Sequence, residues 1–304
     1  MSCSHPMPAV DYGINPNTGN HKIRLLPKRY DMNLEKLRLR YGDSLLMLPC
    51  GKCYSCLKSK AQQWSIRCYL ESLDHIDNCF ITLTYNDDNC PQYLVKDDLR
   101  EFIKKLRTVA GVGVKFFSCG EYGSNTKRPH YHALIFGYLP DDLRSIGSTL
   151  KGSQLFESET LNKLWNKGFV SVGMCDNASI CYCARYTTKK VGESMGVSKE
   201  NKEFILMSRR PGLGLNYLMR NLDKLVDDKL YLGEFGIKSF SRYILNIIKE
   251  VNPLEYDSII NKRLEACKIQ LRDRMLSEGI TSDQVFWNDL EADLEKQKRN
   301  SRGL

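Results

Sequence analysis

Residues 114–136 read VKFFSCGEYGSNTKRPHYHALIF, two apolar stretches separated by a short polar segment. The stretches 114–118 and 130–136 are rich in aromatic and aliphatic side chains and predict two strands. The segment between them runs to Pro129, and Gly137 stops the second strand. This spacing favours an antiparallel return of the chain, so we expect the two strands to pair in one sheet.

The second strand carries two histidines, and the first is followed by a carboxylate. In His130-Tyr131-His132 the side chains alternate, so both imidazoles face one side of the sheet and Tyr131 faces the other. An antiparallel return would bring Glu121 beside them. Two imidazoles and one carboxylate would hold Mn²⁺ or Mg²⁺, with Zn²⁺ not excluded, and leave positions open for substrate oxygens. The alternative is two surface histidines and a solvated turn carboxylate.

Two tyrosines and a lysine recur at helical spacing further along the chain. Tyr182, Tyr186 and Lys189 stand at i, i+4 and i+7, so a helix over residues 178–191 would present them on one face. A protonated phenol is a weak nucleophile, and a nearby ammonium group would favour its phenolate. We expect Tyr182 and Tyr186 to be catalytic, with Lys189 balancing charge. The alternative is that one tyrosine is buried and the other lies on the surface.

The elements around these motifs predict an α+β fold, with a central antiparallel sheet and helices on one face. An N-terminal cysteine knuckle precedes the sheet, and a helical C-terminal region follows it. We expect the parts to span residues 1–70, 71–225 and 226–304. The expected elements are a helix over 57–73, a strand over 80–85, a helix through 99–106 capped by Asp97 and Asp98, a helix near 155–165, a strand over 169–174 and mostly helical sequence over 241–298.

Cysteine spacing near the start of the chain indicates a second metal site. Of the 12 cysteines, Cys50, Cys53 and Cys56 follow one another at intervals of three residues. Structural zinc needs four ligands. Cys3 is the expected fourth ligand, and His5 is the alternative. Free or buried thiols and an iron–sulfur cluster are the competing interpretations.

The basic excess lies in the part of the chain that carries these motifs. The net charge is +9, with 36 Lys+Arg against 25 Asp+Glu in residues 1–249 and 9 against 11 in residues 250–304. A basic surface suits a phosphate backbone, although charge alone fits any basic soluble protein equally well. The candidate DNA contacts are Lys127, Arg128, Arg185, Lys190, Arg209 and Arg210.

The start of the chain and its hydropathy exclude two further classes. The opening MSCSHPMPAV has neither the basic start nor the apolar stretch of a secretory signal. No run approaches the roughly 20 apolar residues of a membrane span. We therefore expect an intracellular protein without a membrane partner.

Taken in order, the motifs resemble those of HUH endonucleases, enzymes named for a His-hydrophobic-His motif. The paired tyrosines resemble the replication-initiator branch of that superfamily. The flanking residues are similar to the replication initiators of gokushovirus-type microviruses, which are small single-stranded DNA phages. The resemblance covers roughly residues 1–220 and rests on PCGKC (49–53), FITLTY (80–85), RPHYH (128–132), WNKGFV (165–170) and SRRPG (208–212).

The resemblance implies a rolling-circle initiator. Such an enzyme would hold a divalent metal at His130, His132 and Glu121, and Tyr182 or Tyr186 would attack the scissile phosphate. It would act on single-stranded or supercoiled circular phage DNA in the cytoplasm of a bacterial host. The sequence has no G-x-x-x-x-G-K-[ST] loop, so strand separation would depend on the host replication machinery, including a helicase.

Two other functions use part of the same residues. An HUH transposase or relaxase would share the chemistry. A non-catalytic, zinc-containing DNA-binding protein would need the cysteines and the basic charge, but it has no use for Glu121, the histidines or the paired tyrosines.

Overall fold

The computed structural model divides the chain into two compact units, which we describe separately. One unit comprises Lys60–Ile247, and the other comprises Met1–Ser59 together with Ile248–Leu304. The boundaries expected near residues 70 and 225 stay a prediction. The described residues are 3, 5–18, 21–26, 34–123, 126–149, 152–187, 202–225, 228–233, 236–282, 284–285, 288–289, 291–292 and 295.

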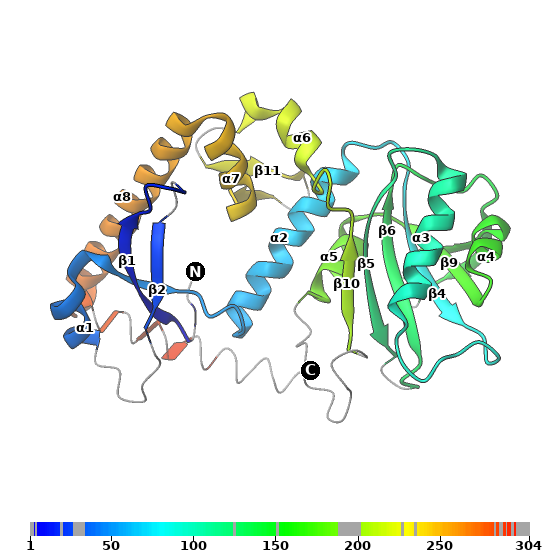
Figure 1. The fold of residues 1–304 in the computed structure, drawn as a ribbon, viewed down its shortest axis with the longest axis horizontal. Coiled ribbons are helices and arrows are strands. Elements are labelled where there is room, and N and C mark those ends of the chain that lie inside the picture. Colours follow the sequence, from blue (N-terminus) through cyan, green and yellow to red (C-terminus); the bar gives the residue numbers. More distant parts are fainter. Residues whose placement is uncertain are drawn as a thin grey trace. The chain divides into compact units, whose positions relative to one another are not determined.

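A seven-stranded antiparallel sheet forms the centre of the unit Lys60–Ile247 (Figure 1). Its strand order is β10-β5-β6-β4-β9-β8-β7, so the two strands of the opening motif, β5 and β6, are neighbours as predicted. The hairpin β7–β8 and the edge strand β10 are additions to the predicted set. The strands are β4 (Asn78–Tyr85), β5 (Lys115–Tyr122), β6 (Pro129–Phe136), β7 (Arg144–Ser148), β8 (Gln154–Glu157), β9 (Gly168–Met174) and β10 (Phe204–Met207).

Helices cover both faces of this sheet. Helices α3 (Lys96–Ala110) and α4 (Glu159–Trp165) pack on the face that contains Tyr131, whereas α2 (Tyr54–Ser72) and α5 (Asn177–Arg185) supply side chains to the core on the opposite face. The α+β class is therefore confirmed, but the sheet has one more helical layer than the expected single one. The second layer follows from β6, whose residues are apolar on both faces.

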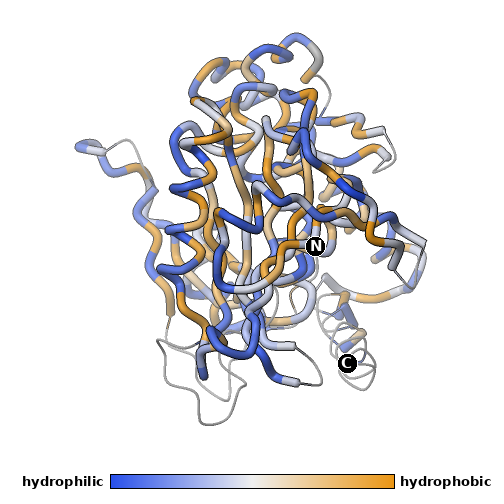
Figure 2. Tube along the Cα trace, turned by 90° about the vertical axis from the view of Figure 1, so that its right-hand side faces the viewer, coloured by the Kyte–Doolittle hydropathy of each residue, from blue (hydrophilic) through white to orange (hydrophobic). Residues whose placement is uncertain are grey.

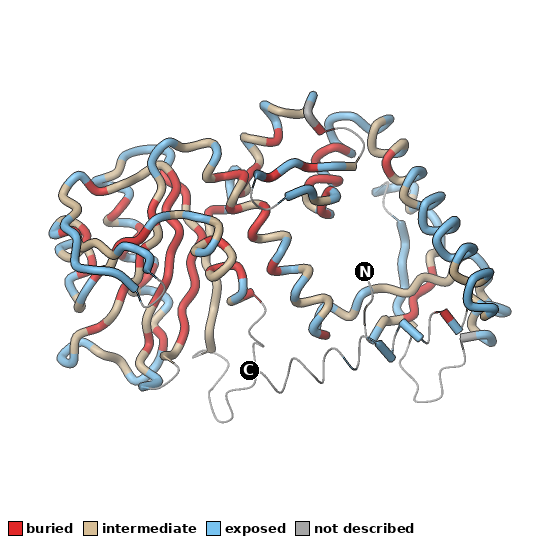
Figure 3. The backbone as a smooth tube through the Cα atoms, turned by 180° about the vertical axis from the view of Figure 1, so that it is seen from behind, coloured by how far each residue is buried: buried red, intermediate tan, exposed pale blue. Residues whose placement is uncertain are grey.

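The burial of β6 explains why its sequence reads as a continuous apolar run. Every residue from Tyr131 to Phe136 is buried, and the central strands form the largest buried group in Figure 3. Their apolar stretches are orange in Figure 2. A strand covered on both faces shows no polar alternation, in contrast to a strand with one solvated face.

Helix α3 begins without a side-chain cap. Its N-cap is Val95, which makes no side-chain cap hydrogen bond, so the predicted capping by Asp97 and Asp98 is wrong. Both carboxylates lie in the first turn of the helix, where they interact favourably with the positive end of the helix dipole.

The unit Met1–Ser59 with Ile248–Leu304 contains a small antiparallel sheet in the order β2-β1-β3. Strand β2 is exposed along its whole length, so its sequence carries no buried pattern that would reveal a strand. The elements of this unit are β1 (Met7–Ile14), β2 (His21–Leu25), α1 (Leu34–Tyr41), η1 (Gly42–Ser44), β3 (Leu45–Leu48) and α8 (Pro253–Glu278), and the unit also takes the first residues of α2 and the last of α7 (Arg242–Val251).

The rest of the unit Lys60–Ile247 follows β10. It contains α6 (Leu215–Arg220), the short helix η3 (Leu222–Lys224), the hairpin of β11 (Lys229–Tyr231) with β12 (Ile237–Ser239), and most of α7. Among the described residues, no helix combines the length and the apolar character that crossing a bilayer requires.

Candidate active site

The strand register brings the predicted metal-binding residues together. Glu121 of β5 pairs directly with His130 of β6, and His132 lies between Cys119 of β5 and Thr82 of β4. Glu121 lies inside β5, which extends four residues beyond the predicted strand end at Ser118. Because side chains alternate along a strand, Glu121, His130 and His132 all point to the same face.

The three side chains converge on one oxygen atom. Oε1 of Glu121 lies 2.8 Å from Nε2 of His130 and 3.0 Å from Nε2 of His132. Cis ligand atoms of a cation with bonds of about 2.1 Å are about 3 Å apart, so this spacing suits an octahedral ion such as Mg²⁺ or Mn²⁺. Both Glu121 and His132 are buried, at 6% and 7% exposure.

Hydrogen bonds on the far side of each ring orient both imidazoles. Nδ1 of His130 lies 3.2 Å from the carbonyl oxygen of Arg128, which can only accept, so Nδ1 carries a proton and the neutral ring would have its lone pair on Nε2. Nδ1 of His132 lies 2.9 Å from Oγ1 of Thr82. Second partners of this kind orient a histidine ring so that Nε2 can bind a metal. At 2.8 Å and 3.0 Å, each Nε2 either donates a proton to the carboxylate of Glu121 or shares a cation with it.

Both candidate tyrosines lie at this cluster. Helix α5 begins with a capping box between Asp176 and Ser179, which fixes its first turn. The hydroxyl of Tyr182 donates to Oε1 of Glu121 over 3.2 Å and lies 3.3 Å from Nε2 of His132. Tyr186 lies directly after the helix, and its ring centroid is 5.1 Å from that of Tyr182.

Tyr186 also lies against the candidate metal ligands. Its ring stacks on that of His132, with 6.0 Å between the centroids and an angle of 26°. The predicted helix reaches residue 191, whereas the described helix ends at Arg185 and a turn follows. Lys189 lies outside the described residues. The structure therefore brings the two phenols and the three candidate metal ligands into one cluster.

The cluster raises the pKa of both phenols. Burial raises the pKa of Tyr182 to about 12, and the negative charge of Glu121 adds to this effect. Burial also raises the pKa of Tyr186 strongly, together with its hydrogen bonds to Glu121 and Tyr182. Both hydroxyls are therefore protonated at neutral pH, and their use as nucleophiles requires a positive charge close by.

Tyr131 faces away from this cluster and has a structural function. Its side chain is fully buried, and its hydroxyl donates to the carbonyl oxygen of Val95 over 2.8 Å and accepts from the amide of Val95 over 3.0 Å. Tyr85 lies 2.8 Å from the same oxygen and donates to Asp98 over 2.6 Å. The phenol therefore connects the start of α3 to β6, on the face of the sheet opposite the two histidines. This explains a polar-tipped residue between the two histidines.

Known proteins share this stretch of the chain. The family model for replication-associated proteins of the ORF2 type matches residues 78–191, which include β4, the histidine strand and both tyrosines. The chain is 35% identical over 230 residues to the replication-associated protein ORF2 of Spiroplasma virus 4, a match that covers 70% of this chain and 68% of that protein. The chain belongs to the family of microvirus replication-associated proteins. The resemblance inferred from the sequence motifs is thus confirmed.

Two further members of the family are similar over a comparable length. The chain is 30% identical over 244 residues to the replication-associated protein VP4 of Bdellovibrio phage phiMH2K, covering 76% of this chain and 78% of that protein. It is 29% identical over 234 residues to the replication-associated protein ORF4 of Chlamydia phage 1, covering 71% and 59%. No solved structure matches.

Three of the candidate DNA contacts of this family member lie at the end of the sheet that holds the cluster. Lys127 is exposed in the loop between β5 and β6. The guanidinium of Arg128 donates to the carboxylate of Asp87 over 2.5 Å and to the carbonyl oxygen of Tyr85 over 3.1 Å. This side chain therefore connects the start of β6 to the end of β4. The guanidinium carbon of Arg185 lies 5.8 Å from the ring centroid of Tyr182.

The other candidate DNA contacts do not join the cluster. The amide of Ser208 donates to the carbonyl oxygen of Phe116, so Arg209 and Arg210 follow at the opposite end of β5 from Glu121. That separation is roughly 20 Å along a strand. Lys190 lies outside the described residues. DNA binding by all of these residues stays a prediction.

Two residues that the sequence did not single out complete the site. Thr82 holds Nδ1 of His132, and Phe80 stacks on the ring of His132 with 5.5 Å between the centroids. Both lie on β4 and share the face of the histidines. The alternation in residues 80–85 could have assigned them to one face, but only the pairing of β4 with β6 shows which face that is.

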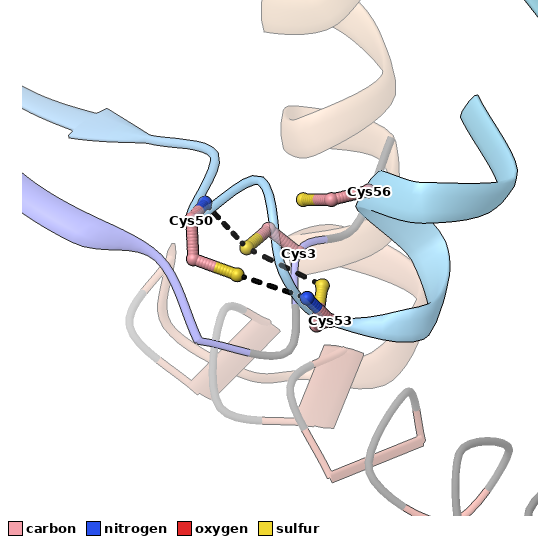
Figure 4. A group of neighbouring side chains, drawn as sticks. All are labelled: Cys3, Cys50, Cys53 and Cys56. Atoms are coloured by element: carbon pink, nitrogen blue, oxygen red, sulfur yellow. Dashed lines mark hydrogen bonds between the residues drawn. The ribbon is translucent and has the colours of Figure 1, made fainter. Parts of the chain in front are cut away.

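The four predicted zinc ligands also lie together, in the other unit. The sulfur atoms of Cys3, Cys50, Cys53 and Cys56 are within 4.8 Å of one another (Figure 4). His5, the alternative fourth ligand, is not part of this group.

Proposed function

We propose that this replication-associated protein starts rolling-circle replication by nicking and rejoining single-stranded DNA. In this proposal Tyr182 or Tyr186 is the nucleophile, and Glu121, His130 and His132 hold a divalent cation, Mg²⁺ or Mn²⁺. One observation carries the proposal: the hydroxyl of Tyr182 reaches the carboxylate on which the two imidazoles converge, and the ring of Tyr186 stacks on His132 of the same cluster. A binding protein has no need of two phenols at a cation site.

The proposed first step is an exchange of phosphate esters. The phenol oxygen of one tyrosine forms a bond to phosphorus, and the bond from phosphorus to the 3′ oxygen breaks. The phenol proton passes through solvent to the departing oxygen, which leaves a 5′-phosphotyrosine and a 3′-OH that can prime synthesis. A bound cation would act as a Lewis acid on the phosphate and offset its charge in the transition state.

The chain's own residues orient this reaction. Thr82 and the carbonyl oxygen of Arg128 hold the imidazoles in position. The capping box at Asp176 fixes the helix that presents Tyr182. Because Tyr182 and Tyr186 share one site, the second phenol can attack after a round of copying and release a unit-length strand. In this proposal the exposed side chains of Lys127 and Arg185 contact DNA phosphates.

The proposed setting follows from the relatives, which are named as replication-associated proteins of phages. The substrate would be circular phage DNA, either single-stranded or supercoiled, in the cytoplasm of the bacterial host. Since the sequence has no phosphate-binding loop of the helicase type, a host helicase would separate the strands.

Nicking of a single-stranded oligonucleotide from the phage origin tests the proposal. With Mn²⁺ present, the wild-type chain should yield a 5′ fragment that ends in a free 3′-OH and a 3′ fragment whose 5′-phosphate is linked to the protein. Each single variant, Tyr182→Phe and Tyr186→Phe, should lose one of the two reactions, cleavage or rejoining, and keep the other. The double variant should form no adduct. Normal nicking by Glu121→Ala and His132→Ala would favour a cation-independent mechanism and contradict the proposal.

A further inference from the structure

The second cluster of metal-binding side chains is independent of the site described above. Cys50 follows β3, Cys53 lies in the turn before α2, and Cys56 lies in the first turn of α2. Cys3 comes from the segment before β1, 47 residues before Cys50 in sequence. Figure 4 shows the four sulfur atoms directed toward one another.

The spacing of these sulfur atoms suits a single tetrahedral ion. Sγ of Cys53 lies 3.7 Å from Sγ of Cys3. In a tetrahedral site with zinc–sulfur bonds of about 2.3 Å, neighbouring sulfurs are about 3.8 Å apart. A disulfide has an S–S distance of about 2.05 Å, and all four cysteines are free thiols in the structure. Four sulfurs within 4.8 Å of one another enclose one ion and leave no room for a multi-iron cluster.

Backbone amides donate hydrogen bonds to the sulfur atoms, as they do in metal sites with cysteine ligands. The amide of Cys50 donates to Sγ of Cys3 over 3.2 Å. The amides of Lys52 and Cys53 donate to Sγ of Cys50 over 3.4 Å and 3.3 Å. Gly51 has a φ of 71°, in the left-handed region that favours glycine, and so permits this tight turn. Amide donors of this kind orient thiolate ligands and stabilise their charge.

The surrounding unit has little apolar core of its own. Strand β2 is fully exposed, and most of α8 is exposed. Small units with so little buried apolar surface commonly depend on a metal or on disulfides. The buried apolar side chains among the described residues of this unit are Pro8, Ala9, Val10, Cys53, Ile248, Ile259 and Val285.

We propose that Cys3, Cys50, Cys53 and Cys56 hold one zinc ion that stabilises this unit. All four positions of the ion are filled by protein sulfur, so the site is closed and structural, with no position for substrate. The ion would tie the segment before β1 to the start of α2. The proposal does not depend on the nicking mechanism, because the two sites share no residue.

Metal analysis of the purified full chain tests the proposal. We expect about one zinc per chain in the wild type and in His130→Ala/His132→Ala, and a loss of most of it in Cys53→Ser. Cys267→Ser, at an exposed cysteine in α8, is the matched control and should retain its zinc. Wild-type protein that contains no zinc and takes up none on addition, or that contains iron instead, would overturn the proposal.

Thiol labelling of the native wild-type chain gives a second test that needs no variant. A maleimide should modify Cys267, while the four clustered cysteines resist labelling until a strong chelator removes the metal. Peptide mass spectrometry identifies the modified positions. Equal labelling of the cluster and of Cys267 before chelation would contradict a bound ion.

Discussion

Replacing Glu121 by Gln removes the charge on which the cluster converges and preserves the shape of the side chain. Oε1 of Glu121 lies at 2.8 Å and 3.0 Å from the two imidazole nitrogens, so the carboxylate would be the one anionic protein ligand of the cation. Loss of a supporting group outside the ligand shell lowers metal affinity 10- to 100-fold, so loss of this charged ligand should lower it about 100-fold or more. That factor corresponds to about 2.7 kcal/mol.

Metal-induced stabilisation gives the expected magnitude. At a Mn²⁺ concentration of about 100 times the wild-type Kd, binding stabilises the native state by about 2.7 kcal/mol. A variant with 100-fold weaker affinity gains only about 0.4 kcal/mol at the same concentration. In a unit of this size 1 kcal/mol shifts Tm by about 2–4 °C. Mn²⁺ should therefore raise Tm by about 5–11 °C in the wild type and by about 1–2 °C in Glu121→Gln.

Thermal unfolding with and without Mn²⁺ measures this difference, and titration calorimetry gives Kd directly. Mn²⁺ prefers nitrogen and oxygen ligands, so the cysteine cluster should not contribute. Glu101→Gln is the matched control, because Glu101 is an exposed carboxylate on α3 whose contact is an ion pair with Lys105. A Glu121→Gln variant that keeps the full wild-type shift in Tm would refute the assignment of this carboxylate as a ligand.

Three further substitutions test the packing of the unit Lys60–Ile247 by denaturant unfolding. Tyr131→Phe removes the hydroxyl that binds both backbone groups of Val95 and should lower stability by about 1–3 kcal/mol without changing Mn²⁺ affinity; a changed affinity would count against its structural function. Glu71→Ala leaves buried Lys115 without its carboxylate and should lower stability by about 3–5 kcal/mol, so a neutral result would contradict a buried ion pair. Gly168→Ala places a Cβ 2.2 Å from a backbone oxygen of β4 and should lower stability by roughly 2 kcal/mol or more; unchanged stability would show that the strands separate freely there.

The centre of the fold could be predicted from sequence because its pattern is local. Residues 80–85 and 130–136 have strand composition, and α3 has an apolar stripe at helical spacing. The small sheet of β1, β2 and β3 could not be predicted, because its strands are partly or fully exposed. The second layer of helices was not predicted: the apolar run in β6 fits a strand that is covered on both faces, but it does not show which helices cover each face.

The part of the candidate site that depends on strand alternation and helical spacing could be predicted from sequence. Period-two alternation placed the histidines on one face, and an antiparallel return brought Glu121 opposite His130. Thr82 could not be assigned to the site. Its contact with His132 depends on β4 being the second neighbour of β6, beside β5. The place of Tyr186 just beyond the end of α5, stacked on His132, depends on packing that spacing alone does not give.

Mapping the covalent DNA adduct tests the central claim most directly. The chain is incubated with Mn²⁺ and circular single-stranded phage DNA, the adduct is digested with protease and nuclease, and the nucleotide-bearing peptide is sequenced by mass spectrometry. Our account predicts a 5′-phosphate linked to Tyr182 or Tyr186, and no adduct when both are Phe. An adduct on another residue, or one that persists in the double variant, would contradict it.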